Sequence, residues 1–255
     1  MKGYIILTVS AALLMHTANA IDEDFMKETG GFVIRDDPGN GFVLIANTQT
    51  RLPEEKLLKP VSYMRFHAKM HIDFKTVDSA LLKIPFAQSM KSLGATVVVF
   101  VKDSKDDHSS IIVSPDERWA SVNVAALNVD DPGDEVLALR TRKAINRALC
   151  LVCGAGGSQY PNTLVGPFKN GVKDYDRFSN EGLPPDVFQR MQHYLKTLDV
   201  RPIVRTTYIN ACQQGWAHAP TNEYQRVIYE RIKAEQSEKP TNPIKILPGQ
   251  KPSGK

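Results

Sequence analysis

Long apolar segments are scarce in this 255-residue sequence, and beyond the first twenty residues none could span a bilayer. The best later run, residues 95–101, has the length of a β-strand. The apolar residues 4–14 lie between the basic Lys2 and the small-x-small sequence Ala-Asn-Ala at 18–20. This order is typical of a secretory signal peptide. We therefore expect residues 1–20 to be removed and the protein to be exported, periplasmic or secreted, without a transmembrane segment in the mature chain.

Cysteine is also scarce, with Cys150, Cys153 and Cys212 as its three occurrences. An oxidising compartment permits one disulfide and leaves one thiol over. Spacing does not decide which two pair, but we expect Cys212 to be one of them. A redox role for Cys150-x-x-Cys153 is disfavoured because the pair falls at the end of a predicted helix, where the dipole opposes a thiolate. A zinc site would need two more ligands, and no second Cys or His pair is present, so we expect neither metal nor cofactor.

The sequence lacks a strong excess of charge. It holds 32 Lys and Arg against 28 Asp and Glu, and loss of Lys2 leaves a net charge of +3. Four lysines and no acid lie in residues 239–255, so residues 21–238 carry 27 basic and 28 acidic side chains. A nucleic-acid-binding protein should carry its basic surface on the folded part, so nucleic acid is not an expected partner. The proline-rich basic segment 239–255 is typical of a disordered tail.

Several catalytic motifs are missing as well. There is no Gly-x-Ser-x-Gly, the elbow of one class of serine hydrolases. The glycine-rich residues 154–157 follow a predicted helix rather than precede one, which favours a turn over a phosphate-binding loop. The acidic pairs Asp130-Asp131 and Asp174/Asp176 are weak evidence for a glycosidase dyad, because their separation in space is not given by the sequence.

The first half of the chain predicts mostly strands. Residues 32–46 have the pattern of a hairpin around a turn at 36–41, and residues 53–58 that of a short helix stopped by Pro60. Apolar and polar side chains alternate strictly over residues 64–75, which predicts a strand with one buried face. On such a strand His67 and His71 would lie roughly 13 Å apart. One metal ion could not bind both, so we interpret them as two polar-face histidines.

The rest of the chain alternates helices and strands. We expect helices at 78–93, 134–153, 185–198 and after Thr221 as N-cap; strands at 96–101 (central in its sheet), 110–113 and 119–125; and an extended or mixed stretch at 201–209. The long helix buries a stripe that comprises Leu137, Thr141, Ile145, Ala148 and Val152. Residues 155–182 form a long glycine-rich connection. The predicted fold is α+β (mixed α/β), a mixed sheet with a long helix packed on it and a helical C-terminal part, in a single domain at residues 21–238.

Residues 96–101 and 120–127, followed by the helix that ends Arg-Thr-Arg-Lys-Ala-Ile-Asn-Arg-Ala-Leu-Cys-Leu-Val-Cys-Gly at 140–154, resemble the core of archaemetzincin-type metalloproteases. In that family a strand of pattern Ser-Val-x-x-Leu precedes a long helix that carries a lysine and then His-Glu-Leu-Gly-His-x-x-Gly. The resemblance implies a metzincin-like core at about residues 95–160, with Lys143 and Gly154 setting the register.

In this register the zinc-site positions of the family carry no chemical residue. Arg147 replaces the first zinc histidine, Ala148 the general-base glutamate, Leu151 the second histidine and Gly157 the third ligand. The motif works because a helix places two imidazoles on one face beside a carboxylate. Arginine, alanine and leucine neither bind zinc nor activate water. The resemblance therefore implies a protein that is not a zinc peptidase of this type, and we assign no catalytic residue.

Three functional hypotheses follow. The leading one is an exported, catalytically degenerate metzincin that binds an extracellular or periplasmic protein, glycoprotein or glycan through a groove beside the long helix and residues 155–182. The second is a secreted hydrolase, a peptidase or glycosidase, that uses carboxylates or a metal site assembled by the fold. The third is a purely structural envelope protein. Turnover that depends on a metal would separate the second from the first.

Overall fold

The computed structural model describes residues 23–35, 41–158, 163–178, 183–200 and 202–238. They divide into two compact units where the sequence suggested one domain: Ile34–Arg205, the larger unit, and a smaller unit built from both ends of the chain, Met1–Val33 with Thr206–Lys255. Each unit has its own hydrophobic core, which local sequence patterns could not reveal. The predicted signal peptide, the turn at 36–40 and the basic tail lie outside the described residues.

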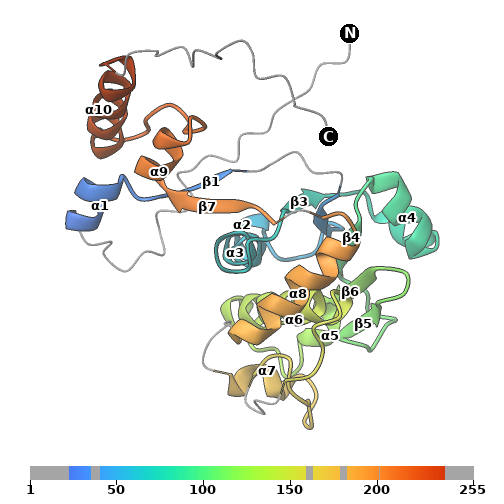
Figure 1. The fold of residues 1–255 in the computed structure, drawn as a ribbon. Coiled ribbons are helices and arrows are strands. Elements are labelled where there is room, and N and C mark those ends of the chain that lie inside the picture. The colour runs from blue at the N-terminus through green and yellow to red at the C-terminus, as the bar shows by residue number, and fades with distance from the viewer. Residues whose placement is uncertain (1–22, 36–40, 159–162, 179–182, 201, 239–255) are drawn as a thin grey trace, which may run out of the picture. The chain divides into compact units, whose positions relative to one another are not determined.

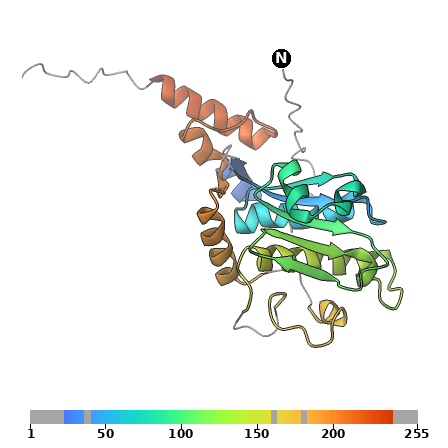
Figure 2. The same cartoon turned by 90° about the vertical axis from the view of Figure 1, so that its right-hand side faces the viewer.

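The larger unit is built on a mixed sheet, which confirms the predicted fold class. The described strands have the order β3 (Ile72–Thr76), β2 (Val43–Asn47), β4 (Val97–Lys102), β6 (Trp119–Asn123) and β5 (Ile111–Ser114) (Figure 2). Neighbours are parallel except β5, which runs antiparallel to β6. The predicted central position of β4 is confirmed, and its apolar residues are buried because both faces of the sheet are covered.

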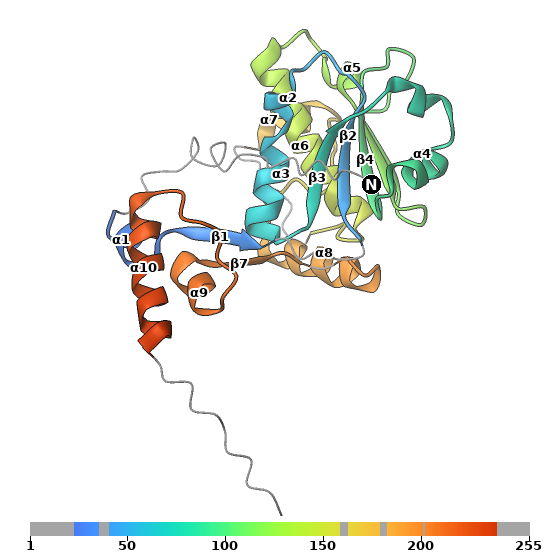
Figure 3. The ribbon, with the colours of Figure 1, turned by 90° about the horizontal axis from the view of Figure 1, so that it is seen from above.

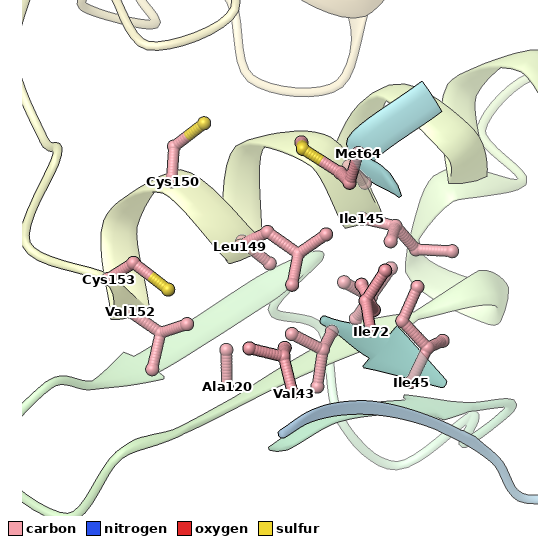
Figure 4. Packing of buried hydrophobic residues seen from close by; sticks show 14 of the residues in the cluster. Val43, Ile45, Met64, Ile72, Ala120, Ile145, Leu149, Cys150, Val152 and Cys153 are labelled. Carbon is pink, nitrogen blue, oxygen red and sulfur yellow. The ribbon is translucent and has the colours of Figure 1, made fainter. Parts of the chain in front are cut away.

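The long helix α6 (Asp134–Val152) covers one face of this sheet (Figure 3). Its predicted stripe is confirmed, since all five of its side chains are buried. Figure 4 shows Leu149 and Val152 directed toward Val43 and Ala120 of the strands. The short α5 (Val124–Leu127) precedes α6, and Gly154, at φ +66°, follows its end as predicted.

The opposite face of the sheet packs against η3 (Ser79–Lys83) and α4 (Phe86–Leu93) (Figure 3). Alternate residues of β2 and β4, such as Leu44 and Phe100, supply this second core. One helix was predicted for residues 78–93. Pro85 divides it because its ring cannot continue the preceding turn, and Gly94 ends the second part at φ +65° as predicted.

The predicted hairpin at residues 32–46 is wrong. β1 (Phe32–Arg35) pairs with β7 (Val204–Thr207), whereas β2 pairs in parallel with β3 and β4. Both strands were predicted, but they were wrongly expected to pair with each other across a tight turn. The partner of β1 lies about 170 residues further along the chain, and no local pattern encodes such pairing.

The predicted twelve-residue strand at 64–75 is also wrong in its first half. Helices α2 (Glu54–Leu57) and α3 (Lys59–Tyr63) lead into a π-helical turn, η2 (Met64–Ala68), and the strand begins at Ile72. Pro60 lies in the first turn of α3, where proline is tolerated, rather than ending a helix. The π-helical turn is stabilised from elsewhere, because the carbonyl of Ala68 accepts a hydrogen bond from Gln192 at 2.6 Å and that of Phe66 one from Arg205 at 2.9 Å.

After α6 the larger unit contains α7 (Lys173–Arg177), inside the long connection, and α8 (Pro185–Thr197), which begins at the predicted proline pair. The stretch predicted as extended or mixed becomes β7 and the start of α9. No helix among the described residues is both long enough and apolar enough to cross a bilayer.

The smaller unit contains α1 (Glu23–Thr29), α9 (Tyr208–Gln213) and α10 (Glu223–Glu238), which lie together in Figure 1. Its core holds Tyr208 and Cys212 of α9 with Ile228 and Ile232 of α10. The predicted cap of α10 is off by one residue. Asn222 Oδ1 accepts a hydrogen bond from the Gln225 amide at 3.0 Å, while Thr221 bonds the Gln225 side chain.

Candidate functional site

One side of α6 carries a basic stripe, which we define as Arg140, Lys143 and Arg147. Spacings of three and four residues place them on the same side of a helix. All three donate hydrogen bonds to backbone carbonyls, and the stripe binds residues 163–178, hereafter the docked segment. Of the positions that the resemblance singled out, Arg147 belongs to this stripe, and it holds the chain's own backbone.

Arg140 is the most completely bound member of the stripe. Its Nε and Nη2 donate to the two carboxylate oxygens of Asp176 at 2.8 and 2.6 Å, and its Nη1 donates to the carbonyls of Leu127 and Val129, both at 3.0 Å. The Arg140 side chain is only 6% exposed. Hydrogen bonding to Asp176 raises the pKa of Arg140, and the same bond lowers the pKa of Asp176.

We predict that the Arg140–Asp176 pair makes stability fall in acid. A carboxylate with a lowered folded-state pKa stabilises the fold above its unfolded pKa of about 3.9, and this contribution is lost as the pH falls through the folded value. Chemical unfolding at pH 7, 5 and 3 should show a smaller decline for Asp176→Asn than for the wild type. Asp174, whose pKa is also lowered, stays intact as the background, and equal declines for the two proteins would contradict the prediction.

Lys143 is buried, with 2% of its surface exposed. Its Nζ donates to the carbonyls of Tyr175 at 2.8 Å and of Phe178, so it binds the end of α7. An ammonium group is rarely buried unless its protons are satisfied, and carbonyls serve that role here. Lys143 therefore fixes the docked segment at one end.

Arg147 fixes the other end of the docked segment. Its Nη1 donates to the carbonyl of Gly166 at 2.9 Å and to that of Leu164, and its guanidinium lies 3.9 Å from the centre of the Phe168 ring. The side chain is half-buried, and this burial lowers the pKa of Arg147. Arg147 is thus a cationic cross-link between α6 and the docked segment.

The docked segment also has internal structure. The Asp174 carboxylate is buried and accepts hydrogen bonds from the Asn170 amide at 2.7 Å, the Lys169 amide and Arg177 Nη1 at 2.8 Å. These donors hold the pKa of Asp174 well below its ordinary range. Asp174 organises α7, and Asp176 binds Arg140, so the two acids have separate structural partners rather than facing a shared substrate.

Ala148, Leu151 and Gly157, the other positions that the resemblance singled out, carry no metal-binding side chain. Ala148 is fully buried in the core between α6 and the sheet, where no solvent reaches. Leu151 is half-buried one turn after Arg147, and Gly157 is exposed at φ +77°. The Gly157 carbonyl accepts a hydrogen bond from Arg190 Nη2 at 2.8 Å. Of residues 154–157, which were predicted to form a turn, Gly154 lies in one, and residues 155–157 have no regular structure.

The other acidic pair, Asp130-Asp131, lies in the loop before α6 with both residues at positive φ. Asp130 Oδ2 lies 3.4 Å from Lys173 Nζ, and both side chains are about two-thirds exposed, at 65% and 67%. Exposed pairs of this kind contribute little to stability. The contact joins the loop before α6 to the docked segment.

His67 and His71 do not share one strand, so the distance argument made from the sequence is wrong. His67 belongs to η2, and its ring lies 4.8 Å from that of Tyr63; His71 precedes β3, with its ring 6.2 Å from that of Phe42. Burial and the nearby Arg205 charge lower the pKa of His67. Within the part of the chain that the structure describes, no group of three or more His, Cys, Asp or Glu side chains is placed to hold a metal ion.

The predicted disulfide is absent, and all three cysteines are free, buried thiols. Cys150 and Cys153 end α6, and Figure 4 shows their sulfurs directed to different sides. Cys212 belongs to the core of the smaller unit. Burial raises the pKa of Cys153 to about 12 and also raises those of Cys150 and Cys212. The thiols act as small apolar core residues.

A second polar cluster, which sequence reasoning missed, lies at the carboxyl ends of the parallel strands. Asn123, fully buried at the end of β6, donates to the Ser104 carbonyl and accepts from its amide, both at 2.9 Å. Asp103, just after β4, binds Arg51 through both oxygens at 2.6 and 2.8 Å. The available signal was a polar residue at the end of each of the strands that prove to be parallel. Here these groups fix the loops to one another.

Comparison with protein-family models gives no match, and comparison with curated proteins gives none either. Two solved structures are similar to this chain. Archaemetzincin from Methanopyrus kandleri has 14% identity and a TM-score of 0.48, over 64% of this chain and 99% of its own. A zinc-dependent peptidase from Methanocorpusculum labreanum has 13% identity and a TM-score of 0.44, over 59% of this chain and 100% of its own. The first of them is an archaemetzincin, the family that the sequence resembles, and both likenesses are distant.

Proposed function

We propose that this chain is an exported, non-catalytic protein with a degenerate metzincin-like core that binds a protein or glycoprotein ligand on the α6 side of its larger unit. The export part rests on the signal-peptide pattern of residues 1–20. The binding part rests on the half-buried Arg147, where the docked segment meets α6.

The observation that carries the proposal is the set of contacts that Arg147 makes. At the position that matches the first zinc histidine, a guanidinium is held between two backbone carbonyls and an aromatic ring. A cation in this place repels a metal ion, and its contacts give it a structural task. The neighbouring position, which should carry a general base, is the fully buried Ala148. Neither residue supplies the nucleophilic water of the zinc mechanism.

The proposal predicts binding without turnover. Incubation of the mature protein, residues 21–255, with a panel of peptides and glycoproteins should give no cleavage above a no-protein control, with zinc added or with EDTA. An active zinc peptidase run in parallel shows that the panel can be cleaved. Retention of panel members on the immobilised protein should identify ligands. Cleavage that EDTA abolishes would contradict the proposal, and cleavage insensitive to EDTA would favour a carboxylate-based hydrolase.

A further inference from the structure

The guanidinium groups of Arg140 and Arg147 are bound alike at Nη1 but differ in the partners of Nε and Nη2. In both, Nη1 donates to two backbone carbonyls: Leu127 and Val129 for Arg140, Leu164 and Gly166 for Arg147. The Nε and Nη2 groups of Arg140 form a bidentate pair with the Asp176 carboxylate. Among the described residues, the Nε and Nη2 groups of Arg147 meet no such acceptor.

The positive charges of Arg140 and Arg147 are therefore compensated to different extents. Hydrogen bonding to the Asp176 carboxylate raises the pKa of Arg140, whereas at Arg147 burial outweighs the charge interactions with Tyr175, Cys150 and Asp174 and lowers the pKa. Two carbonyls and the face of Phe168 compensate the Arg147 charge in part. A half-buried guanidinium without a carboxylate retains a desolvation cost that an anion would relieve. The Nε–Nη2 edge matches the two oxygens of a carboxylate.

We propose that the Nε–Nη2 edge of Arg147 is a receptor for a carboxylate group of a bound peptide, completing the arrangement that Asp176 completes at Arg140. The inference rests on the proposed function, since it treats this position as one that binds rather than cleaves. It names the chemistry of the ligand: a peptide that presents either its C-terminal carboxylate or an acidic side chain. No covalent step is involved.

The test is a titration of the ¹⁵N-labelled mature protein with sodium acetate, followed by the Arg Nε–Hε resonances. Acetamide, a neutral molecule of the same shape, and sodium chloride at equal ionic strength are the controls. Acetate should shift the Arg147 resonance saturably and the controls should not. Arg147→Lys removes this resonance and so assigns it. It should weaken acetate binding about tenfold, measured on the backbone amides of residues 164–166 and 168. Arg142→Met, on the same helix, should leave the response unchanged.

Three acetylated tripeptides distinguish the two sources of the carboxylate: one with a free C-terminus, its amide, and an amide with an internal glutamate. Tighter binding of either acidic peptide than of the neutral amide supports the receptor, and the tighter of the two names the source. Equal shifts with acetate and acetamide, or an acetate response that Arg147→Lys leaves intact, would overturn it. If the receptor is overturned in this way but no turnover is found, the non-catalytic proposal still stands. EDTA-sensitive turnover would overturn the non-catalytic proposal whatever the acetate titration shows.

Discussion

Ala148→Glu is expected to unfold much of the larger unit, with a loss of about 4 kcal/mol or more in the free energy of unfolding. Ala148 has no exposed surface and packs in the core between α6 and the sheet. A glutamate there would overfill the core and bury a carboxylate without a partner. The variant restores the general-base residue of the metzincin motif by sequence, yet the surrounding core would not accept it.

The measurement is urea unfolding followed by tryptophan fluorescence in a Trp216→Phe background. Trp119 lies in the larger unit and Trp216 in the smaller one, so the remaining tryptophan reports on the larger unit. Val136→Glu is the matched control, because Val136 is on the same helix and 39% exposed. It should change stability by about 0.5 kcal/mol or less. Equal stability of Ala148→Glu and this control would show that the position is open to solvent.

The destabilisation caused by Ala148→Glu should also depend on pH. The neutral carboxylic acid is less costly to bury than the carboxylate, so the destabilisation should shrink as the pH falls below the raised folded pKa of the new group.

The parts of the fold that the sequence predicts well are those in which burial is encoded locally. The stripe of α6 repeats at helical spacing and is buried as predicted, and the continuous apolar run of β4 indicates a strand covered on both faces. Gly94 and Gly154 end their helices at positive φ, as their positions indicate. In each case neighbouring residues are sufficient to determine the structure.

The predictions are wrong where residues far apart in the sequence determine the local structure. The alternation over 64–75 is real, but Met64 and Ala68 are buried by a π-helical turn whose carbonyls are bound by Gln192 and Arg205. β1 pairs with β7 rather than with its neighbour β2. Pairings over more than a hundred residues depend on the whole topology, so periodicity could suggest these strands without assigning their partners.

The sequence singled out Arg147 but did not predict its contacts. The resemblance led to Arg147, Ala148 and Leu151 as positions without chemistry, and the structure gives Arg147 a task as a cross-link to Leu164 and Gly166. The participation of Arg140 and Lys143 was not predicted, although their spacing along α6 was visible. The carbonyl partners of Arg140 lie at the end of α5 and just after it, and those of Lys143 lie in the connection after α6. The sequence could not show that these carbonyls come close to the two side chains.

Arg147→His combined with Leu151→His is expected to create zinc affinity that the wild type lacks. The two positions are four residues apart within α6 and both half-buried, so two imidazoles would share one face of the helix. Zinc at a hundred times its Kd should then stabilise the double variant by about 2.7 kcal/mol. Arg147→His alone removes the guanidinium but supplies one ligand, and it serves as the control for loss of the cross-link.

Zinc titration of the mature wild-type protein by calorimetry, beside the double variant, tests most directly the claim that this face of α6 is a structural cross-link rather than a metal site. We predict no saturable zinc binding to the wild type and one saturable site in the double variant. Stoichiometric zinc binding by the wild type that Arg147→Lys alters would contradict the account.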